Sequence, residues 1–258
     1  MAWQNDSLQK FVVSFALVDS SEKKWWLFEA TPDLKFQLQY FKTLTGGVYN
    51  YLPEGIFITH AHIGHYAGLM QFGKEVMSTK ELPVYVLPRM KVFLETNGPW
   101  SQLVKLKNIV IHPLKEDAVL SLADKISVEA FRVPHRDEFS ETAGFKILTG
   151  NKKYLFIPDI DKWEKWSRNI IDEVKSADVA LLDGTFYEGD ELPGRKISEV
   201  PHPLVTETME LFKNESRTVK SKIFFIHFNH TNPLLWNNDV KAEFKKYGFN
   251  LTQQGQVF

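Results

Sequence analysis

The sequence predicts an α/β fold in which two β-sheets pack face to face and helices cover the outside. Strand-like runs come in groups at first and then alternate with helical patterns. The second half of the chain partly repeats the order of β-runs followed by a helix that the first half contains. Because no low-complexity linker separates the halves, we expect a single domain over residues 1–258.

The composition allows a substantial core and excludes several classes of function. The chain has 258 residues, of which 43% are hydrophobic, and 31 basic against 32 acidic residues give a net charge of -1. No overall electric field therefore favours nucleic acid or an anionic membrane. The absence of cysteine excludes disulfides, thiolate metal ligands and a cysteine nucleophile.

No apolar run reaches membrane-spanning length, and the N-terminus lacks the basic-then-apolar pattern of a signal peptide. We therefore expect a soluble protein. The cytoplasm is the default location, and a removed signal or lipoprotein segment is the alternative.

In the first half of the chain, apolar runs bounded by turn residues predict strands, and apolar residues at i, i+4 and i+7 predict helices. Gly46 and Gly47 break the first helical pattern. The expected strands are residues 10–18, 25–29, 55–59 and 83–87, and the expected helices are residues 34–41, a segment after residue 65, and residues 88–97.

The second half begins with β-like runs and ends with alternating helices and strands. Gly150 and Asn151 indicate the turn of a hairpin. The expected strands are residues 108–113, 118–122, 125–133, 142–149, 153–157, 178–182 and 222–226, with a last one near residue 249. The expected helices are residues 163–174, residues 203–212 and a closing helix after residue 227.

Three histidines, His60, His62 and His65, follow an apolar strand-like run within six positions. In an extended or tightly turned segment the side chains of His60 and His62 point the same way. His65 falls where a helix would begin, so its side chain turns back toward the same point. Neutral imidazole is the commonest ligand of a borderline-soft divalent ion. A lone histidine after a strand is usually structural, but three at this spacing predict a metal site.

Further polar side chains occur where later apolar runs stop, namely His135, Asp159, Asp183 and His227. Strand ends that meet at one edge of a sheet are where rigid scaffolds commonly build sites. Each residue alone is more often structural, since an aspartate after a strand usually makes a turn or caps a helix. Their recurrence behind the histidine cluster favours a shared site.

Residues 59–65, followed by Gly68 and Leu69, resemble the His-x-His-x-Asp-His signature of the metallo-β-lactamase superfamily. The resemblance implies an αββα sandwich of two mixed sheets with one or two zinc ions at the sheet edge. In that family a metal-bound water, whose pKa the ion lowers, attacks an ester, phosphodiester, thioester or amide. By position, the implied ligands are His60, His62 and His135 for one ion and His65 and His227 for the other, with Asp159 bridging.

Residues 28–34, 183–186 and 225–234 are similar to segments of the pyrroloquinoline quinone biosynthesis protein B family. That group is related to the phosphodiesterase branch of the superfamily, which contains tRNase Z and a phosphonate-pathway cyclic phosphodiesterase. The narrower resemblance does not identify a substrate, and the expected partner is a small-molecule or phosphodiester substrate.

Two departures from the family pattern affect the expected site. The aspartate of the signature, which normally binds the second metal, is Gly64 here. We therefore expect a well-formed first metal site and a weakened or vacant second one, unless His230 or Asp161 compensates. Related chains also have an earlier strand and a glycine-rich turn, so the N-terminal strand of the family is expected to be missing.

Several further residues are candidates for catalysis or support, each with a structural alternative. His202 resembles the histidine that tRNase Z-like enzymes place near the scissile phosphate, where it would protonate a leaving group; otherwise it lies in a surface loop. Asp33 would orient a ligand histidine or cap the following helix. Asp183 would line the pocket or make a turn, and His230 and Asn232 are expected to line the pocket or to be structural.

Three functions remain open at this point. The leading hypothesis is a metal-dependent hydrolase in which Asp159 positions the attacking hydroxide and His202 assists the leaving group. The second is an iron-dependent oxidative enzyme of quinone-cofactor biosynthesis, because three histidines and a carboxylate suit iron or manganese as well as zinc. The third is a non-catalytic binding protein that kept the fold after Gly64 replaced the aspartate. The sequence predicts neither the substrate nor the oligomeric state.

Overall fold

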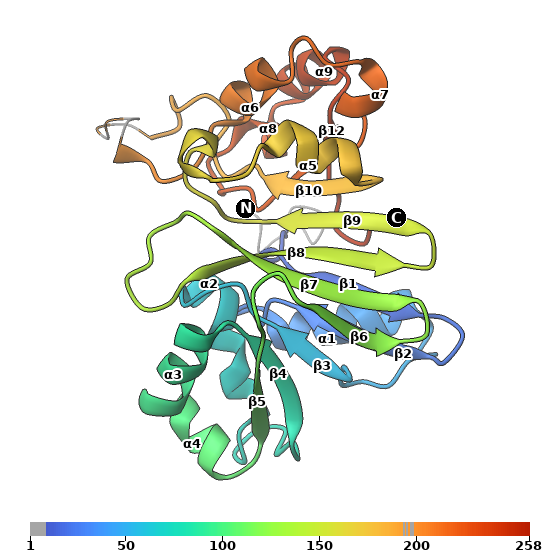
Figure 1. Ribbon diagram of the computed structural model, residues 1–258, viewed down its shortest axis with the longest axis vertical. Coiled ribbons are helices and arrows are strands. Elements are labelled where there is room, and N and C mark those ends of the chain that lie inside the picture. Colours follow the sequence, from blue (N-terminus) through green and yellow to red (C-terminus); the bar gives the residue numbers. More distant parts are fainter. Residues whose placement is uncertain (1–8, 193, 195, 197–198) are drawn as a thin grey trace. The chain divides into compact units, whose positions relative to one another are not determined.

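The computed structural model describes residues 9–192, 194, 196 and 199–258 (Figure 1). The chain divides into two compact units. Unit 1 comprises Met1–Pro113 with Gln253–Val257, and unit 2 comprises Leu114–Thr252 with Phe258. No helix within the described ranges is long and apolar enough to cross a membrane.

Unit 1 contains a five-stranded mixed sheet. The first two strands form an antiparallel hairpin, and the remaining neighbours are parallel. The hairpin closes over Asp19, whose carboxylate accepts the N–H groups of Ser21 and Glu22, as an Asx turn does. In sheet order the strands are β1 (Phe15–Asp19), β2 (Lys24–Phe28), β3 (Gly55–Phe57), β4 (Leu82–Val86) and β5 (Ile109–Pro113).

The helices of unit 1 bury apolar side chains against this sheet. Leu34 and Leu38 of the first helix lie one turn apart and join Trp25 and Phe72 in the core. The helices are α1 (Leu34–Leu44), α2 (Ile63–Tyr66), the 3₁₀ helix η3 (Ala67–Phe72), α3 (Pro88–Thr96) and α4 (Trp100–Lys105).

A close backbone contact fixes the position of α2 and η3. The N–H of Ala30 donates to the carbonyl of His65, and the N–H of Gly68 donates to the carbonyl of Ala30. A Cβ atom at Gly68 would lie 2.1 Å from the carbonyl oxygen of Thr31, so only glycine fits there. The start of this helical segment is therefore held against the end of β2.

Unit 2 contains a seven-stranded mixed sheet. Its first four strands form an antiparallel meander. From the fourth strand onward, each strand pairs in parallel with the next one along the chain. The strands are β6 (Val119–Ala123), β7 (Ile126–Val133), β8 (Thr142–Thr149), β9 (Lys152–Ile157), β10 (Val179–Asp183), β11 (Ile223–Ile226) and β12 (Asn250–Leu251), in the sheet order β12-β11-β10-β9-β8-β7-β6.

The helices of unit 2 pack on a core that includes Phe131, Phe212, Phe225 and Phe244. The helices are the 3₁₀ helix η4 (Trp163–Lys165), α5 (Ile170–Ser176), α6 (Val205–Leu211), α7 (Arg217–Lys220), α8 (Pro233–Trp236) and α9 (Asn238–Lys246). The predicted α/β class with two mixed sheets and helices is confirmed.

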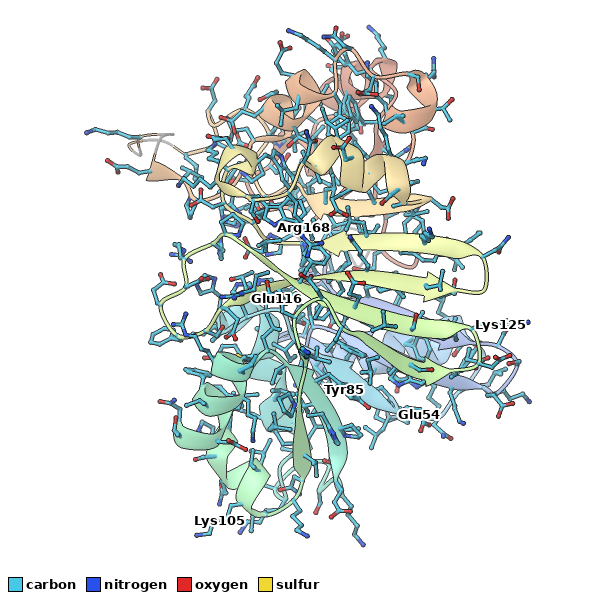
Figure 2. The ribbon with its side chains drawn as sticks, viewed as in Figure 1. Glu54, Tyr85, Lys105, Glu116, Lys125 and Arg168 are labelled. Carbon is cyan, nitrogen blue, oxygen red and sulfur yellow. The ribbon has the colours of Figure 1, made fainter. Side chains whose placement is uncertain are left out.

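The single helix predicted over residues 163–174 is wrong, because two elements replace it. Asn169 has extended backbone and its side chain accepts the N–H of Ile171, which starts α5 afresh. Between the two elements, Arg168 pairs with Asp117 and lies 4.8 Å from the ring of Phe131 (Figure 2).

Other boundaries also differ from the expectation. The strand expected from residue 10 begins only at Phe15, because the segment before it bonds to side chains such as Asp33 and Gln254 instead of to a ladder. Helices α4 and α7 were not predicted. Both are short, so each shows too few turns for a periodic apolar pattern.

Candidate metal centre

The three clustered histidines lie just beyond the end of β3 in unit 1. The chain leaves the sheet after Phe57 and passes through Thr59 and His60 before α2 begins. His62 has extended backbone immediately before α2, and His65 lies within that helix. His60 and His65 are buried, while His62 is partly exposed.

The imidazoles converge, as the spacing predicted. Nε2 of His60 lies 2.7 Å from Nδ1 of His62, and the ring centroids of His60 and His65 are 4.2 Å apart. Two ring nitrogens that face each other at this distance can share one cation, and zinc accepts imidazole nitrogens of either kind. His60 and His62 are therefore two candidate ligands of one ion.

Glu29 lies behind these histidines and was missed by the sequence analysis. Its side chain is 0% exposed. Its Oε1 accepts a hydrogen bond from the Thr59 hydroxyl at 2.6 Å and lies 3.3 Å from Nδ1 of His65. The Thr59 hydroxyl is also 2.9 Å from Nδ1 of His60. One buried carboxylate thus contacts the candidate ligand His65 directly and the candidate ligand His60 through the Thr59 hydroxyl.

The sequence contained a signal for Glu29. It follows the apolar run of β2 as Asp159 follows that of β9, and β2 and β3 are parallel neighbours with Phe28 opposite Phe57. Their carboxyl ends therefore meet at one edge of the sheet, which brings Glu29 to Thr59.

Asp33, for which a ligand-orienting or capping side chain was predicted, does neither in the structure. It occupies the N-cap position of α1 without a side-chain capping bond. Its Oδ2 instead accepts the N–H of Val12 at 2.9 Å, which ties the segment before β1 to the helix. Within unit 1, the carboxylate of Glu29 lies against a histidine, His65.

In unit 2, three parallel strands end side by side and bring their terminal residues together. Leu182 of β10 lies opposite Ile157 of β9, and Asp183 lies opposite Ile226 of β11. Asp159 and His227 follow the ends of β9 and β11, so both lie beside Asp183 at the same sheet edge.

Asp159 and Asp183 hold His202 between them. Nδ1 of His202 lies 3.1 Å from Oδ1 of Asp159 and 2.9 Å from Oδ2 of Asp183. Nε2 of His135 lies 3.3 Å from the same oxygen of Asp159. The His202 side chain is only 12% exposed, so the expectation of a surface-loop histidine is wrong.

Burial and the two carboxylates act in opposite directions on the pKa of His202. Burial, the largest effect, lowers it, but the charges and hydrogen bonds of Asp183 and Asp159 together outweigh burial and raise the pKa to about 10. Between these carboxylates the imidazole holds a proton at neutral pH, which a general acid requires.

His227 is held by a hydroxyl group. Its Nδ1 lies 2.7 Å from Oγ1 of Thr185, which donates to Oδ1 of Asp183 at 2.6 Å. Asp183, His202 and His227 present ligand atoms that all lie within 4.8 Å of one another. Because the two carboxylates keep a proton on His202, these three side chains hold that proton in place of a metal ion.

The remaining residues predicted for the site have other surroundings. Asn232 is fully buried and donates to the carbonyls of Gly184 and Thr185, so it holds the loop that bears Thr185. His230 is exposed. The carboxylate of Asp161 pairs with Lys165 at 2.7 Å. Neither His230 nor Asp161 belongs to the groups of described histidine and acidic side chains that could hold a metal ion.

Gly64 itself lies in α2 with open space around it. A Cβ atom built there would meet only Cγ1 of Val12, at 3.9 Å. A side chain at position 64 is therefore sterically allowed, and glycine is not required by the backbone.

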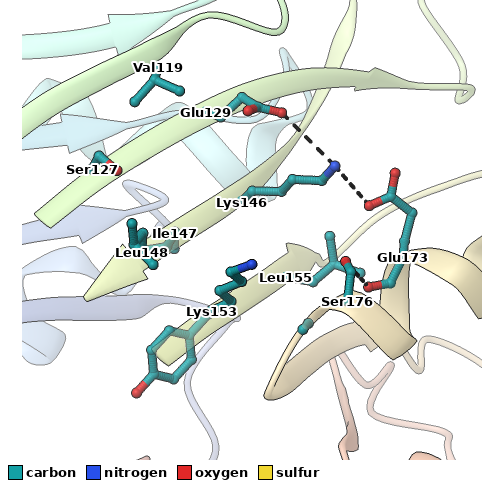
Figure 3. Close-up of a pocket in the computed structure, with 12 residues that line it drawn as sticks. Val119, Ser127, Glu129, Lys146, Ile147, Leu148, Lys153, Leu155, Glu173 and Ser176 are labelled. Carbon is teal, nitrogen blue, oxygen red and sulfur yellow. Dashed lines mark hydrogen bonds and ion pairs between the residues drawn. The ribbon is translucent and has the colours of Figure 1, made fainter. Parts of the chain in front are cut away.

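The surface cavity of unit 2 is separate from this chemistry. It has a volume of about 280 Å³ and is lined by strands β6 to β9 and by α5 (Figure 3). Within it, Lys146 lies 4.0 Å from Glu129 and 2.9 Å from Glu173. The charges pair with one another, and no site residue predicted from the sequence is among the described residues that line the cavity.

Comparison with known proteins gives concordant matches. The sequence model of a family described as "Beta-lactamase superfamily domain" matches residues 24–228. "Coenzyme PQQ synthesis protein B" of Gluconobacter oxydans is 23% identical over an alignment 266 positions long, which covers 93% of this chain and 84% of that protein.

Two solved structures have a similar fold. Zn(2+)-bound PqqB from Methylobacterium extorquens has a TM-score of 0.79 at 20% identity, over 99% of this chain and 90% of that one. Human tRNase Z, short form, has a TM-score of 0.61 at 16% identity, over 96% of this chain and 92% of that one.

Proposed function

The chain belongs to the beta-lactamase superfamily domain family, and on this basis we propose that it is a metal-dependent hydrolase of a phosphodiester or a related ester. The proposed ligands of the principal ion are His60, His62 and His135. His65, Asp159 and His227 form a second, weaker set. A divalent ion in such a set makes a water molecule acidic enough to attack an ester at neutral pH.

The observation that carries this proposal is the convergence of His60 and His62 in unit 1. Their facing nitrogens are 2.7 Å apart, and the buried Glu29 carboxylate lies behind the cluster. Buried imidazoles backed by a carboxylate are typical of metal ligands and their supports. Zinc is the proposed ion because the similar PqqB structure is described as zinc-bound.

His202 is the proposed general acid. It lies between Asp159 and Asp183, which keep its imidazole protonated. A protonated imidazole in reach of the substrate donates to a departing alkoxide, a step commonly worth about 10²- to 10⁴-fold in rate. The fold similarity to human tRNase Z motivates a phosphodiester as the first substrate to test.

The test combines elemental analysis with hydrolysis assays. The full chain is purified without added metal, and its zinc, iron and manganese are counted per chain. It is then assayed with bis(p-nitrophenyl) phosphate, a thioester and a lactone. We expect bound zinc and phosphodiester hydrolysis, both of which the double variant His60→Ala, His62→Ala loses.

His112→Ala is the matched control, since His112 is an exposed histidine on β5. It is expected to keep both metal and activity. Unchanged zinc content in the double variant would refute the assignment of the ligands. A metal-loaded chain that is inactive on every ester would refute the hydrolase.

The relatives named coenzyme PQQ synthesis protein B favour a second function, a role in the synthesis of that quinone cofactor. For this role we propose an oxidative step with iron at the same residues. Histidine and carboxylate ligands suit iron(II) as well as zinc. A chain isolated with iron that consumes oxygen in the presence of a tyrosine-containing peptide would favour this function over hydrolysis.

A further inference from the structure

Each unit contains a buried carboxylate, a threonine hydroxyl and a histidine connected in the same order. We call these arrangements acid–threonine–histidine triplets. The first is Glu29–Thr59–His60 in unit 1, and the second is Asp183–Thr185–His227 in unit 2. Both carboxyl side chains are 0% exposed.

The two triplets have closely matching geometry. In unit 1 the Thr59 hydroxyl is 2.6 Å from the Glu29 carboxylate and 2.9 Å from Nδ1 of His60. In unit 2 the Thr185 hydroxyl is 2.6 Å from the Asp183 carboxylate and 2.7 Å from Nδ1 of His227. Two unrelated segments of the chain thus use the same three groups in the same order.

Proton counting fixes the direction of both hydrogen bonds. A threonine hydroxyl has one hydrogen, and an ionised carboxylate can only accept. The hydroxyl hydrogen therefore belongs to the bond with Glu29 or Asp183. The hydroxyl oxygen is then left as the acceptor for the ring, so Nδ1 of His60 and of His227 must donate. A neutral imidazole with its proton on Nδ1 has its lone pair on Nε2.

The backbone at these triplets is strained. Glu29 has φ +73° and His227 has φ +61°. Both values lie in the left-handed region, which residues other than glycine rarely adopt. Residues held in such conformations cluster at functional sites, where the surrounding structure fixes them. Here the strained residue is the acid of one triplet and the histidine of the other.

We propose that Glu29 with Thr59, and Asp183 with Thr185, are positioning pairs that fix His60 and His227 as Nδ1–H tautomers and make Nε2 the ligand atom of each. The predicted effect on metal affinity rests on the proposed function, whereas the predicted tautomers of His60 and His227 do not. Glu29 acts on a second ligand as well, because its Oε1 lies 3.3 Å from Nδ1 of His65. Supports of this kind typically change metal affinity about 10- to 100-fold.

The test is long-range ¹H–¹⁵N correlation spectroscopy of the metal-free full chain labelled with ¹⁵N-histidine, in which the ¹⁵N shifts of each ring show which nitrogen carries the proton. The signals are assigned by comparison with His60→Gln and His227→Gln. We expect the proton on Nδ1 in both residues. Thr59→Val and Thr185→Val remove the hydroxyl at nearly constant volume, and should turn His60 or His227, respectively, into a mixture of tautomers.

Each variant has a conservative partner and a control. Thr59→Ser and Thr185→Ser keep the hydroxyl and should keep the wild-type tautomer. Thr79→Val in unit 1 and Thr208→Val in unit 2 remove buried hydroxyls that bond backbone carbonyls, and both should leave the two histidines unchanged. Zinc affinity, measured by competition with a chelator, should fall about 10- to 100-fold in Thr59→Val and Thr185→Val and should not fall in the two control variants.

The outcomes separate this inference from the proposed function. A proton on Nε2 of His60 or His227 in the wild-type spectrum would overturn the positioning pairs, even if a valine variant failed to fold. So would a folded Thr59→Val chain with unchanged tautomer and zinc affinity. A chain with the expected tautomers that binds no metal would support the positioning pairs and refute the hydrolase.

Discussion

Oε1 of Glu29 lies 3.3 Å from Nδ1 of His65, and both side chains are buried. The two residues are joined through the backbone as well, because the N–H of Ala30 donates to the carbonyl of His65. The end of β2 therefore supports α2 both by a carboxylate contact and by a main-chain hydrogen bond. The first prediction follows from this contact.

Glu29→Gln should weaken zinc binding about 10-fold while the protein stays folded. Glutamine keeps the shape and an acceptor oxygen for Thr59, but it lacks the negative charge that lies 3.3 Å from Nδ1 of His65. Chelator competition measures the affinity. Glu22→Gln, at an exposed position in the β1–β2 turn, is the control, and equal zinc affinity for both variants would contradict the role of Glu29.

Gly64→Asp should raise the zinc content from one ion per chain toward two. The position has open space, with only Val12 Cγ1 within 4 Å of a new Cβ atom, and a carboxylate there would restore the residue found in the family signature. Elemental analysis after dialysis against zinc gives the count. Gly64→Asn has the same shape without the charge and should stay at one ion.

Two zinc ions in the wild-type chain would show that the second site is already complete without an aspartate at position 64.

Gly68→Ala should destabilise the fold although it adds only one methyl group. The new Cβ would lie 2.1 Å from the Thr31 carbonyl oxygen and 2.8 Å from Leu34 Cβ. Overpacking of this kind typically costs about 1–3 kcal/mol in the free energy of unfolding. Urea unfolding measures the loss. Gly64→Ala, four residues earlier in open space, should change stability far less, and equal losses would contradict the close contact.

His202→Gln should lower kcat about 10²- to 10⁴-fold for a phosphodiester with an alkoxide leaving group. The loss should be much smaller for a p-nitrophenolate leaving group, which needs no proton to depart. Zinc content should stay unchanged, because His202 is not among the proposed ligands. Steady-state kinetics on the two substrates measures the difference. Equal losses on both would mean that His202 does not act as a general acid.

Local patterns in the sequence were sufficient to predict the sheets and the histidine cluster. The alternating and apolar residues that predict β7 and β8 are close together in the sequence. The short spacing of His60, His62 and His65 likewise indicated that their side chains lie together. The recurrence of polar residues at strand ends also indicated Asp159 and Asp183, which the parallel register of β9 and β10 brings together.

What the sequence did not reveal depends on partners far along the chain. Glu29 meets Thr59 thirty residues later. The position of Glu29 after an apolar run was a signal in the sequence, but the parallel pairing of β2 with β3 that brings it to Thr59 was not. The break in the predicted helix of residues 163–174 has a similar cause. The helical spacing of apolar residues continues across the break. The helix itself is interrupted where Asn169 caps α5 and Arg168 packs on Phe131.

The residue in the middle of each triplet is branched at Cβ. A serine would offer the same hydroxyl, but the extra methyl group of Thr59 and Thr185 restricts rotation about χ1. The direction of each hydroxyl is therefore set partly by covalent structure before any hydrogen bond forms. Replacing threonine with serine should keep each histidine in its tautomer and widen the range of ring orientations. The direction of the Nε2 lone pair would then vary more, while the ring nitrogen that carries the proton stays the same.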